Sequence, residues 1–423
     1  MKQVVTFIMS VVTLLSCADT QEVGKPYCGW KEGEMDIHHI YTGRGESSLL
    51  ILPDATSLLV DIGDWDPDYY DKMSKALPNS SRRAGEWVAR YVERVNPRGK
   101  VIDYLMISHF HEDHMGDCSN PVEKTKDRDP NYLITGVTHA GEYLSFNKII
   151  DRAWPDYTYP LPIIEVEEDV NNYRAFLDWK LKQKETKVER FVVGKSDQVR
   201  LLYDNKKYGK IFKVQNLVAN GDVWTGKGEN YISCYDLHPD NKTGVQNENT
   251  KSIGICVSYG PFRYFTAGDL SGKLKDADGK EFEIDEVATR ICGQVDVCKA
   301  NHHAYLDAMT EGFLKQIDAQ AYIIQVWDYL HLQPSIIERM VSTHTNDKKK
   351  SLVFPTYIPS PSLLDAHAGE PWMSSVCKET GHVVVKVFDN GKQYKIYVLS
   401  ADDETQIVKA TYGPYAAGDN NKR

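Results

Sequence analysis

The segment Ile107–Asp117 reads I-S-H-F-H-E-D-H-M-G-D and brings four side chains that can bind metal ions into six positions. It follows VIDYLMIS at 101–108, whose branched apolar residues predict a buried strand. In layered α/β proteins, binding sites form where such strands end. The sequence therefore predicts a metal site here, with a solvated histidine-rich loop as the alternative. The four side chains are His109, His111, Asp113 and His114.

The spacing within this segment predicts two neighbouring ions. His109 and His111 lie two residues apart, so both point to the same side of an extended backbone and can bind one ion. A tight turn into a helix directs Asp113 and His114 at a second ion, and Gly116 helps the backbone bend. Imidazole and carboxylate ligands are typical of zinc, manganese or iron sites. We expect two divalent metal ions, with zinc as the first choice.

The remaining patterns indicate an α/β protein. Apolar runs separated by turn residues predict hairpins, and apolar stripes at helical spacing predict helices. Residues 120–225 are less regular and resemble an inserted segment that covers the site. The expected hairpins are 48–62, 251–269 and 382–400, the expected strands 36–41, 295–303 and 321–327, and the expected helices 80–95, 170–184 and 335–342.

Charge and cysteine content limit the function classes. The net charge is -10, so the surface as a whole does not suit a polyanion, and a nucleic-acid substrate would need a local basic patch or metals. None of the eight cysteines forms a CxxC zinc pattern, and their spacing assigns no disulfide pairs.

The amino terminus resembles the leader of a bacterial lipoprotein. Lys2 precedes an apolar run, Val4–Leu15, that is too short for a resident membrane helix, and the run ends in Leu-Leu-Ser before Cys17. We expect export, cleavage before Cys17 and anchoring to a bacterial membrane through lipid on that thiol, on the periplasmic or cell-surface side. An ordinary secretory signal is the alternative. The expected divisions are a signal peptide at 1–16, a tether at 17–36, a domain at 37–400 and a loose tail at 401–423.

The chain resembles the metallo-β-lactamase fold superfamily over about residues 37–335. HFHEDH is similar to its H-x-H-x-D-H signature, LLVDIG to its first motif, YFTAGDL to the segment that bears a bridging carboxylate, and VDVCKANHH to its last histidine-bearing strand. G-R-G-E-S at 43–47 and Asn249–Ser252 are similar to the subgroup of ComEC-type and phosphorylcholine esterase domains. The resemblance implies a four-layer αββα sandwich with an inserted segment over the site.

The resemblance also implies roles for residues outside the histidine cluster. Asp269 would bridge the ions, and either His302 or His303 would be the last ligand, with the other packed nearby. The third-motif ligand would be His139, His238 or water. The subgroup commonly follows the double histidine with Gly-Ser, whereas Ala304-Tyr305 stand here, which leaves its substrate chemistry in doubt. Asp113, His303 and Asp61 are the expected catalytic residues, Asp61 by orienting an imidazole.

These features predict an exported metal-dependent hydrolase that acts on a phosphodiester or another phosphate ester. The substrate would be a small molecule, and a nucleic acid remains an alternative. The fold also hosts hydrolysis of lactones, amides and thioesters, and a non-catalytic surface binding protein is a further alternative. His331 is a candidate anion donor, and replacing His111 or Asp113 with alanine is expected to abolish turnover. The sequence does not indicate the oligomeric state.

Overall fold

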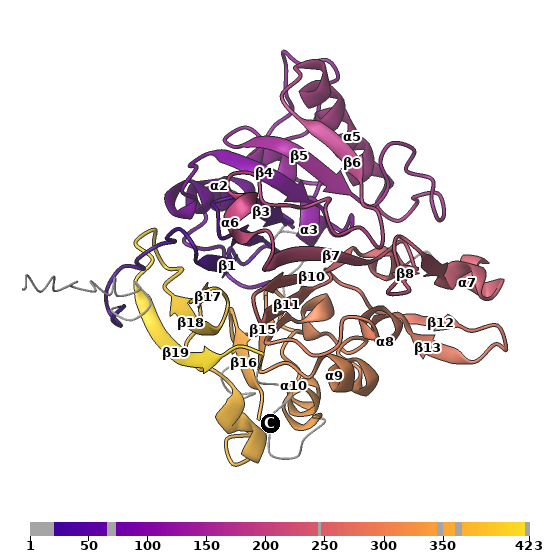
Figure 1. Cartoon of the computed structure of the whole chain (residues 1–423). Coiled ribbons are helices and arrows are strands. Elements are labelled where there is room, and N and C mark those ends of the chain that lie inside the picture. Colours follow the sequence, from indigo (N-terminus) through magenta and orange to yellow (C-terminus); the bar gives the residue numbers. More distant parts are fainter. Residues whose placement is uncertain (1–20, 66–72, 244–246, 345–349, 360–365, 419–423) are drawn as a thin grey trace, which may run out of the picture.

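Figure 1 shows the computed structural model of the chain, which describes residues 21–65, 73–243, 247–344, 350–359 and 366–418. The expected signal peptide at 1–16 and the expected lipid on Cys17 lie outside the described residues. Within the described ranges, no helix is both long and apolar enough to cross a membrane.

The first sheet has nine strands among the described residues, and its centre carries the histidine cluster. The hairpin expected at 48–62 forms β2 and β3, and the strand expected before the histidines forms β4. In spatial order the strands are β19 (Val408–Ala416), β18 (Gln393–Leu399), β17 (His382–Phe388), β1 (Met35–His39), β2 (Ser48–Ile51), β3 (Ser57–Val60), β4 (Val101–Met106), β5 (Ser145–Asp151) and β6 (Lys187–Arg190).

The second sheet has eight strands among the described residues and carries the later site segments. The hairpin expected at 251–269 forms two of its strands. In spatial order they are β16 (Leu352–Pro355), β15 (Ala321–Ile324), β14 (Val297–Lys299), β11 (Phe262–Thr266), β10 (Gly254–Tyr259), β7 (Phe212–Ala219), β8 (Asp222–Trp224) and β9 (Tyr231–Ser233). A separate pair consists of β12 (Lys273–Lys275) and β13 (Glu281–Glu283).

The two sheets pack face to face around a shared apolar core. Leu50, Val60 and Met106 of the first sheet belong to the same buried cluster as Val257 and Ile323 of the second. These residues are at most 3 % exposed, so the layer between the sheets excludes water.

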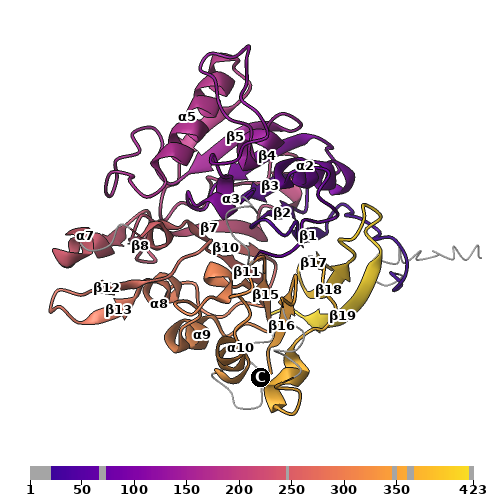
Figure 2. The same ribbon diagram turned by 180° about the vertical axis from the view of Figure 1, so that it is seen from behind.

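Helices cover the outer face of each sheet and complete four layers (Figures 1 and 2). One apolar cluster joins the first sheet to α2, α4 and α5, whose bounds are Ala84–Val95, Gly136–Ala140 and Glu167–Lys182. Another joins the second sheet to α8, α9 and α10, whose bounds are Ile284–Thr289, Glu311–Ile317 and Pro334–Ser342. The expected αββα sandwich is therefore confirmed. The remaining short helices are α3 (Glu112–Met115), α6 (Asn205–Tyr208) and α7 (Asp240–Thr243).

Parallel strand pairs bring the site segments to one edge of the sandwich. β3 is parallel to β4 in the first sheet, and β11, β14 and β15 are successive parallel neighbours in the second. The carboxyl ends of these strands lead directly into Asp61, His109, Asp269 and His302. Because the carboxyl ends of parallel strands lie on one side of a sheet, residues far apart in the sequence meet there.

The segment 120–225, expected as an insert over the site, is built into both sheets. Its strands β5 and β6 form one edge of the first sheet, and β7 and β8 belong to the second. Its helix α5 packs on the outer face of the first sheet. Two residues of this segment, Glu165 and Val166, line the cavity at the site.

Both ends of the expected domain extend further than the sequence predicted. The tail expected at 401–423 contains β19, which pairs with β18 and places Tyr412 against the core between the sheets. Part of the expected tether also packs: Tyr27 donates a hydrogen bond to Asp36 at 2.8 Å, and Pro26 forms a β-bridge with Ile407. The aromatic rings of these tyrosines gain burial while their hydroxyls keep polar partners.

One buried carboxyl group makes stability depend on pH. Asp285 in α8 is 1 % exposed, and its Oδ2 has no hydrogen-bond partner. Burial first, and then the neighbouring Glu283 and Glu286, raise the pKa of Asp285 from 3.8 to about 8. The folded chain therefore holds this proton more tightly than the unfolded chain. The raised pKa of Asp285 therefore stabilises the folded chain. This stabilisation is complete below pH 3.8 and is lost as the pH rises towards 8.

We expect Asp285→Asn to remove this loss. Relative to the wild type, its free energy of unfolding should gain on the order of 3 kcal/mol between pH 4 and pH 8.5, because Asn cannot ionise. Urea unfolding at a series of pH values measures the difference. Asp278→Asn, at an exposed position, is the control, and its free energy of unfolding should differ from that of the wild type by the same amount at every pH. If the difference for Asp285→Asn is also independent of pH, this carboxyl group does not control the pH dependence.

Candidate metal centre

Two glycines allow the histidine segment to approach the neighbouring strands. The Glu46 N–H donates to the Asp113 carbonyl at 2.7 Å, and the Ile62 N–H donates to the His114 carbonyl at 2.8 Å. A Cβ at Gly63 would lie 1.8 Å from the Asp113 carbonyl oxygen, and one at Gly45 would lie 2.3 Å from it. Only glycine fits this close, so the short helix α3 is fixed against β2 and β3.

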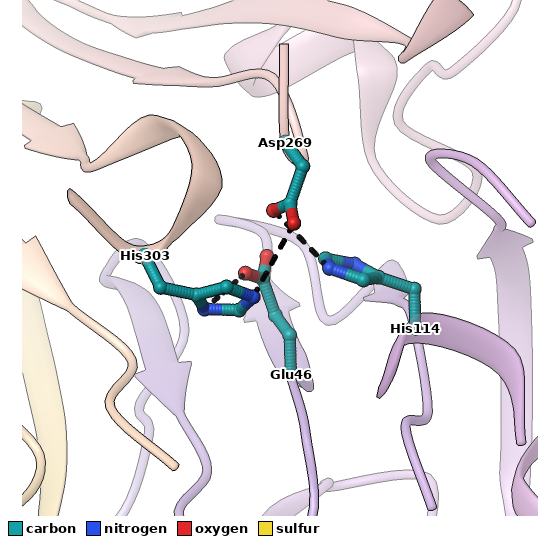
Figure 3. Close-up of side chains that lie close together, drawn as sticks. All are labelled: Glu46, His114, Asp269 and His303. Atoms are coloured by element: carbon teal, nitrogen blue, oxygen red, sulfur yellow. Dashed lines mark ion pairs between the residues drawn. The ribbon is translucent and has the colours of Figure 1, made fainter. Parts of the chain in front are cut away.

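Four buried side chains from both sheets converge at the centre of the site. Glu46, His114, Asp269 and His303 each offer a ligand atom, and these atoms lie within 4.8 Å of one another (Figure 3). His114 Nε2 lies 3.2 Å from Asp269 Oδ1, and His303 Nε2 lies 3.5 Å from Asp269 Oδ2. Asp113 completes the group, because its Oδ2 lies 3.0 Å from His303 Nε2 and 3.4 Å from His114 Nε2.

His109 and His111 form a second group beside the first. His109 Nε2 lies 3.1 Å from His111 Nδ1, and the rings of His109 and His114 have centroids 4.1 Å apart. Zinc–nitrogen bonds of about 2.0–2.1 Å in tetrahedral geometry place two nitrogens roughly 3.4 Å apart. The His109–His111 pair therefore has the separation that one ion requires, as the two-residue spacing predicted.

Hydrogen bonds outside the cluster fix the orientation of its imidazoles. Asp61 Oδ2 accepts from His114 Nδ1 at 2.8 Å and from the Ser108 hydroxyl at 2.6 Å. Ser108 Oγ in turn lies 3.1 Å from His109 Nδ1, and the Gln325 carbonyl lies 2.7 Å from His303 Nδ1. Each Nδ1 thus carries a proton, so Nε2 is the nitrogen of each ring that faces the cluster. The orienting role expected of Asp61 matches this geometry.

His111 has the opposite arrangement, with Nδ1 towards the cluster. Its Nε2 lies 3.5 Å from Glu165 Oε1. Glu165 also accepts a hydrogen bond from the Glu248 N–H at 3.2 Å, which holds the carboxylate in place. Sequence reasoning did not assign a role to Glu165, which lies in the irregular segment far from the motif.

The residues present fit a pair of divalent cations. His114 Nε2 and Asp269 Oδ1 are buried and have no hydrogen-bond partner, although each faces the other. Buried polar atoms without partners are costly, and a cation would satisfy both. The nitrogen and oxygen donors suit zinc, manganese or iron.

The carboxylates of the cluster raise the pKa of two of its imidazoles and so keep protons on them. Burial lowers the pKa of His303, but Asp269 and Asp113 outweigh it and raise this pKa to about 9. The pKa of His114 is likewise raised well above its usual value by these carboxylates and Asp61, against the effect of burial. The pKa of Asp269 is held well below its usual range by His114 and His303, despite its burial. Cations would replace these protons, so metal uptake would release them.

The structure shows which of His302 and His303 lies in the cluster, a choice that the sequence left open. His303 is 1 % exposed and contacts Asp113 and Asp269. His302 is partly exposed, its Nδ1 pairs with Asp307 at 2.6 Å, and its Nε2 lies 3.9 Å from Asp269. Both residues have left-handed backbones, with φ of 44° for His302 and 47° for His303. Such strain is typical of functional sites, and here it turns His303 inwards.

Glu46 is the member of the cluster that sequence reasoning missed as a candidate ligand. Its Oε2 lies 2.6 Å from the fully buried Lys299 Nζ, which also donates to the Gly268 carbonyl at 2.7 Å. Lys299 therefore neutralises Glu46 and holds the backbone next to Asp269. The Gly-x-Gly-Glu-Ser pattern was the available signal, because its second glycine, Gly45, permits the close approach to Asp113.

His139, expected as a metal ligand, lies elsewhere. It lines a different cavity with Arg82, Glu86 and Glu142, and its ring packs on Tyr143. Its helix α4 packs against α2 on the outer face of the first sheet, which turns the side chain away from the strand ends. His238 is also outside the cluster and lies 3.8 Å from Asp240. Neither supplies the third-motif ligand.

A cavity of ≈ 380 Å³ opens onto the cluster. Trp65, Trp327 and Tyr305 contribute aromatic walls, and Asn249 and His331 contribute polar groups. A cavity of this volume accepts a small molecule or a single group of a larger one.

A buried ion pair holds the backbone of the histidine segment in place. Arg152 is 0 % exposed and donates two hydrogen bonds to Glu248, at 2.6 and 2.7 Å. Glu248 Oε1 accepts the N–H of Phe110, which lies between His109 and His111, at 3.2 Å. The Arg152 guanidinium also lies 4.5 Å from the Phe110 ring centroid. Arg152 and Glu248 thus fix the backbone between two candidate ligands.

Comparisons with known proteins found weak structural similarity. No family model matches the chain, and no curated protein matches it. A diphosphatase of the PhnP family has 10% sequence identity and a TM-score of 0.33, over 84% of this chain and 97% of that chain. Zinc-bound PqqB from Methylobacterium extorquens has 11% identity and a TM-score of 0.27, over 78% of this chain and 85% of that chain.

Proposed function

We propose that this chain is a metallo-β-lactamase-like hydrolase that binds two divalent cations, zinc first among them, and cleaves a phosphodiester or another phosphate ester. The observation that carries the proposal is the convergence of four imidazoles with the carboxylates of Asp113 and Asp269 beside a cavity. Outer partners orient these imidazoles so that one nitrogen of each faces its neighbours in the cluster. A purely structural cluster has no need of several imidazoles whose nitrogens are all directed at the same small space.

The bound cations would lower the pKa of a water molecule and stabilise negative charge on the attacked group. The chain's own contribution is to hold protons in fixed places. Asp61 keeps a proton on His114 Nδ1, and the Gln325 carbonyl keeps one on His303 Nδ1. Lys299 balances the charge of Glu46 beneath the site. Trp327 and Tyr305 form part of the cavity wall beside the cluster.

Metal removal and replacement test the proposal. The protein as isolated is expected to contain two zinc, manganese or iron ions per chain by elemental analysis. Treatment with a chelator should abolish hydrolysis of bis-p-nitrophenyl phosphate, and adding the ions back should restore it, because the residues alone offer no strong nucleophile. Nitrocefin and a lactone, assayed in parallel, report on the other substrate classes.

Two results would overturn the proposal in different ways. A protein that binds no transition metal would favour a non-catalytic binding protein. A two-metal protein that cleaves the lactone or nitrocefin and leaves the phosphodiester intact would belong to the alternative class of hydrolases. The amino-terminal pattern that ends at Cys17 supports export and a lipid anchor, and labelling of the protein with radioactive palmitate in cells tests that part of the proposal.

A further inference from the structure

One imidazole at the cavity is left over once the candidate ligands are assigned. His331 lines the cavity and is 4 % exposed, but it is outside the cluster of candidate ligands found among the described residues. Its ring is stacked on that of His303, with centroids 4.7 Å apart and planes 15° apart. The Trp327 ring packs against it edge-on, at 5.0 Å and 85°. His331 is therefore held rigidly beside the site.

The hydrogen bonding of His331 fixes which nitrogen carries its proton. Its Nδ1 accepts the backbone N–H of Asp328 at 3.5 Å, within a turn that a hydrogen bond from the Leu330 N–H to Asp328 Oδ1 closes at 2.6 Å. A proton on Nδ1 would place two N–H groups against each other, so this contact favours the tautomer that carries its proton on Nε2. Nε2 is then the ring atom that remains for a substrate.

We propose that His331 Nε2–H donates a hydrogen bond to the oxygen of the attacked group, on which negative charge grows during hydrolysis. This inference rests on the proposed hydrolase function and names a residue that acts beside the metal ligands. The proton stays on His331 throughout, so the group stabilises charge without transferring a proton. A neutral donor that packing holds in place needs little reorganisation when that charge appears, which is the property that makes such donors effective.

A pair of variants separates this role from packing. His331→Met fills a similar volume without a donor, and it should lower kcat about 100-fold while KM stays within about threefold. His331→Gln keeps an amide N–H at a comparable distance from the backbone. Its kcat should be at least about tenfold higher than that of His331→Met. Both variants should retain the metal content and the unfolding midpoint of the wild type.

His382→Met is the matched control. His382 is buried, and its Nδ1 also accepts a backbone N–H, from Tyr41 at 3.0 Å, but it does not line the cavity. Its replacement should leave kcat within about twofold.

The outcomes separate the two proposals. If the wild type binds two ions but cleaves none of the substrates, the hydrolase function fails and the role of His331 fails with it. If the wild type is active and His331→Met retains its kcat, only the role of His331 is overturned. Equal losses for His331→Met and His331→Gln would likewise overturn it, because a packing role does not depend on an N–H donor.

Discussion

Asp113→Ala is expected to lower kcat/KM for bis-p-nitrophenyl phosphate by at least about 1,000-fold, with the fold retained. Asp113 Oδ2 lies 3.0 Å from His303 Nε2 and 3.4 Å from His114 Nε2, so it joins the histidine segment to the last histidine. Alanine removes the carboxylate that contacts both of these imidazoles. The variant should also contain fewer than two ions by elemental analysis, whereas its circular dichroism spectrum should match that of the wild type.

Asp54→Ala is a suitable control for the loss of a buried carboxylate. Asp54 is 6 % exposed and accepts backbone N–H groups of Thr56, Tyr203 and Asp204, well away from the cavity. Its loss should reduce stability and leave the metal content and kcat/KM intact. If Asp113→Ala behaves in the same way, with two ions and normal turnover, then Asp113 is not a ligand of the catalytic centre.

Arg152→Met is expected to produce the largest loss of stability, about 3 kcal/mol in the free energy of unfolding. Methionine removes a fully buried cation and leaves Glu248 with the single partner cation Lys251, 3.3 Å away. The backbone of Phe110 would lose its fixed acceptor, so metal affinity at His109 and His111 should weaken as well. Denaturant unfolding and a competition assay with a zinc chelator measure the two effects.

A second pair of variants shows whether burial causes this loss. Arg90 makes an equally short two-point contact with Glu404, but the Arg90 side chain is 39% exposed, so Arg90→Met should cost at most about 1 kcal/mol. Arg152→Met with Glu248→Gln should recover part of the stability, because the buried Glu248 charge is removed together with its arginine partner, although Lys251 then loses one of its anionic contacts. A similar cost for Arg90→Met and Arg152→Met would contradict this account.

The parts of the site that sequence predicted well are those set by local spacing. His109 and His111 could be placed because two residues in an extended segment share a side. Asp269 was expected from the resemblance of YFTAGDL to the superfamily segment that bears a carboxylate, and it lies in the cluster. Apolar patterns predicted the individual strands and helices, whereas the four-layer sandwich was expected from the resemblance to the metallo-β-lactamase fold superfamily. β19 was missed because Tyr, Gly and Pro residues interrupt its apolar pattern.

The predictions that were wrong or incomplete concern residues whose positions depend on tertiary contacts. His139 lies close to the motif in sequence, but the packing of α4 on α2 carries it to the outer face of the first sheet. Glu46 comes from a loop between β1 and β2 whose path is set by contacts with Asp113. The choice between His302 and His303 depends on left-handed backbone angles that no periodicity predicts.

The division of the candidate ligands between the two sheets has a consequence for the molecule as a whole. His109, His111, Asp113 and His114 follow β4 of the first sheet, whereas Asp269 and His303 follow β11 and β14 of the second. An ion held by residues from both would act as a cross-link between the two halves of the protein. Thermal stability should then rise with free metal concentration, by about 4 kcal/mol at a thousandfold excess over Kd. Cells short of metal would hold a chain whose halves separate more readily, and proteases could remove it.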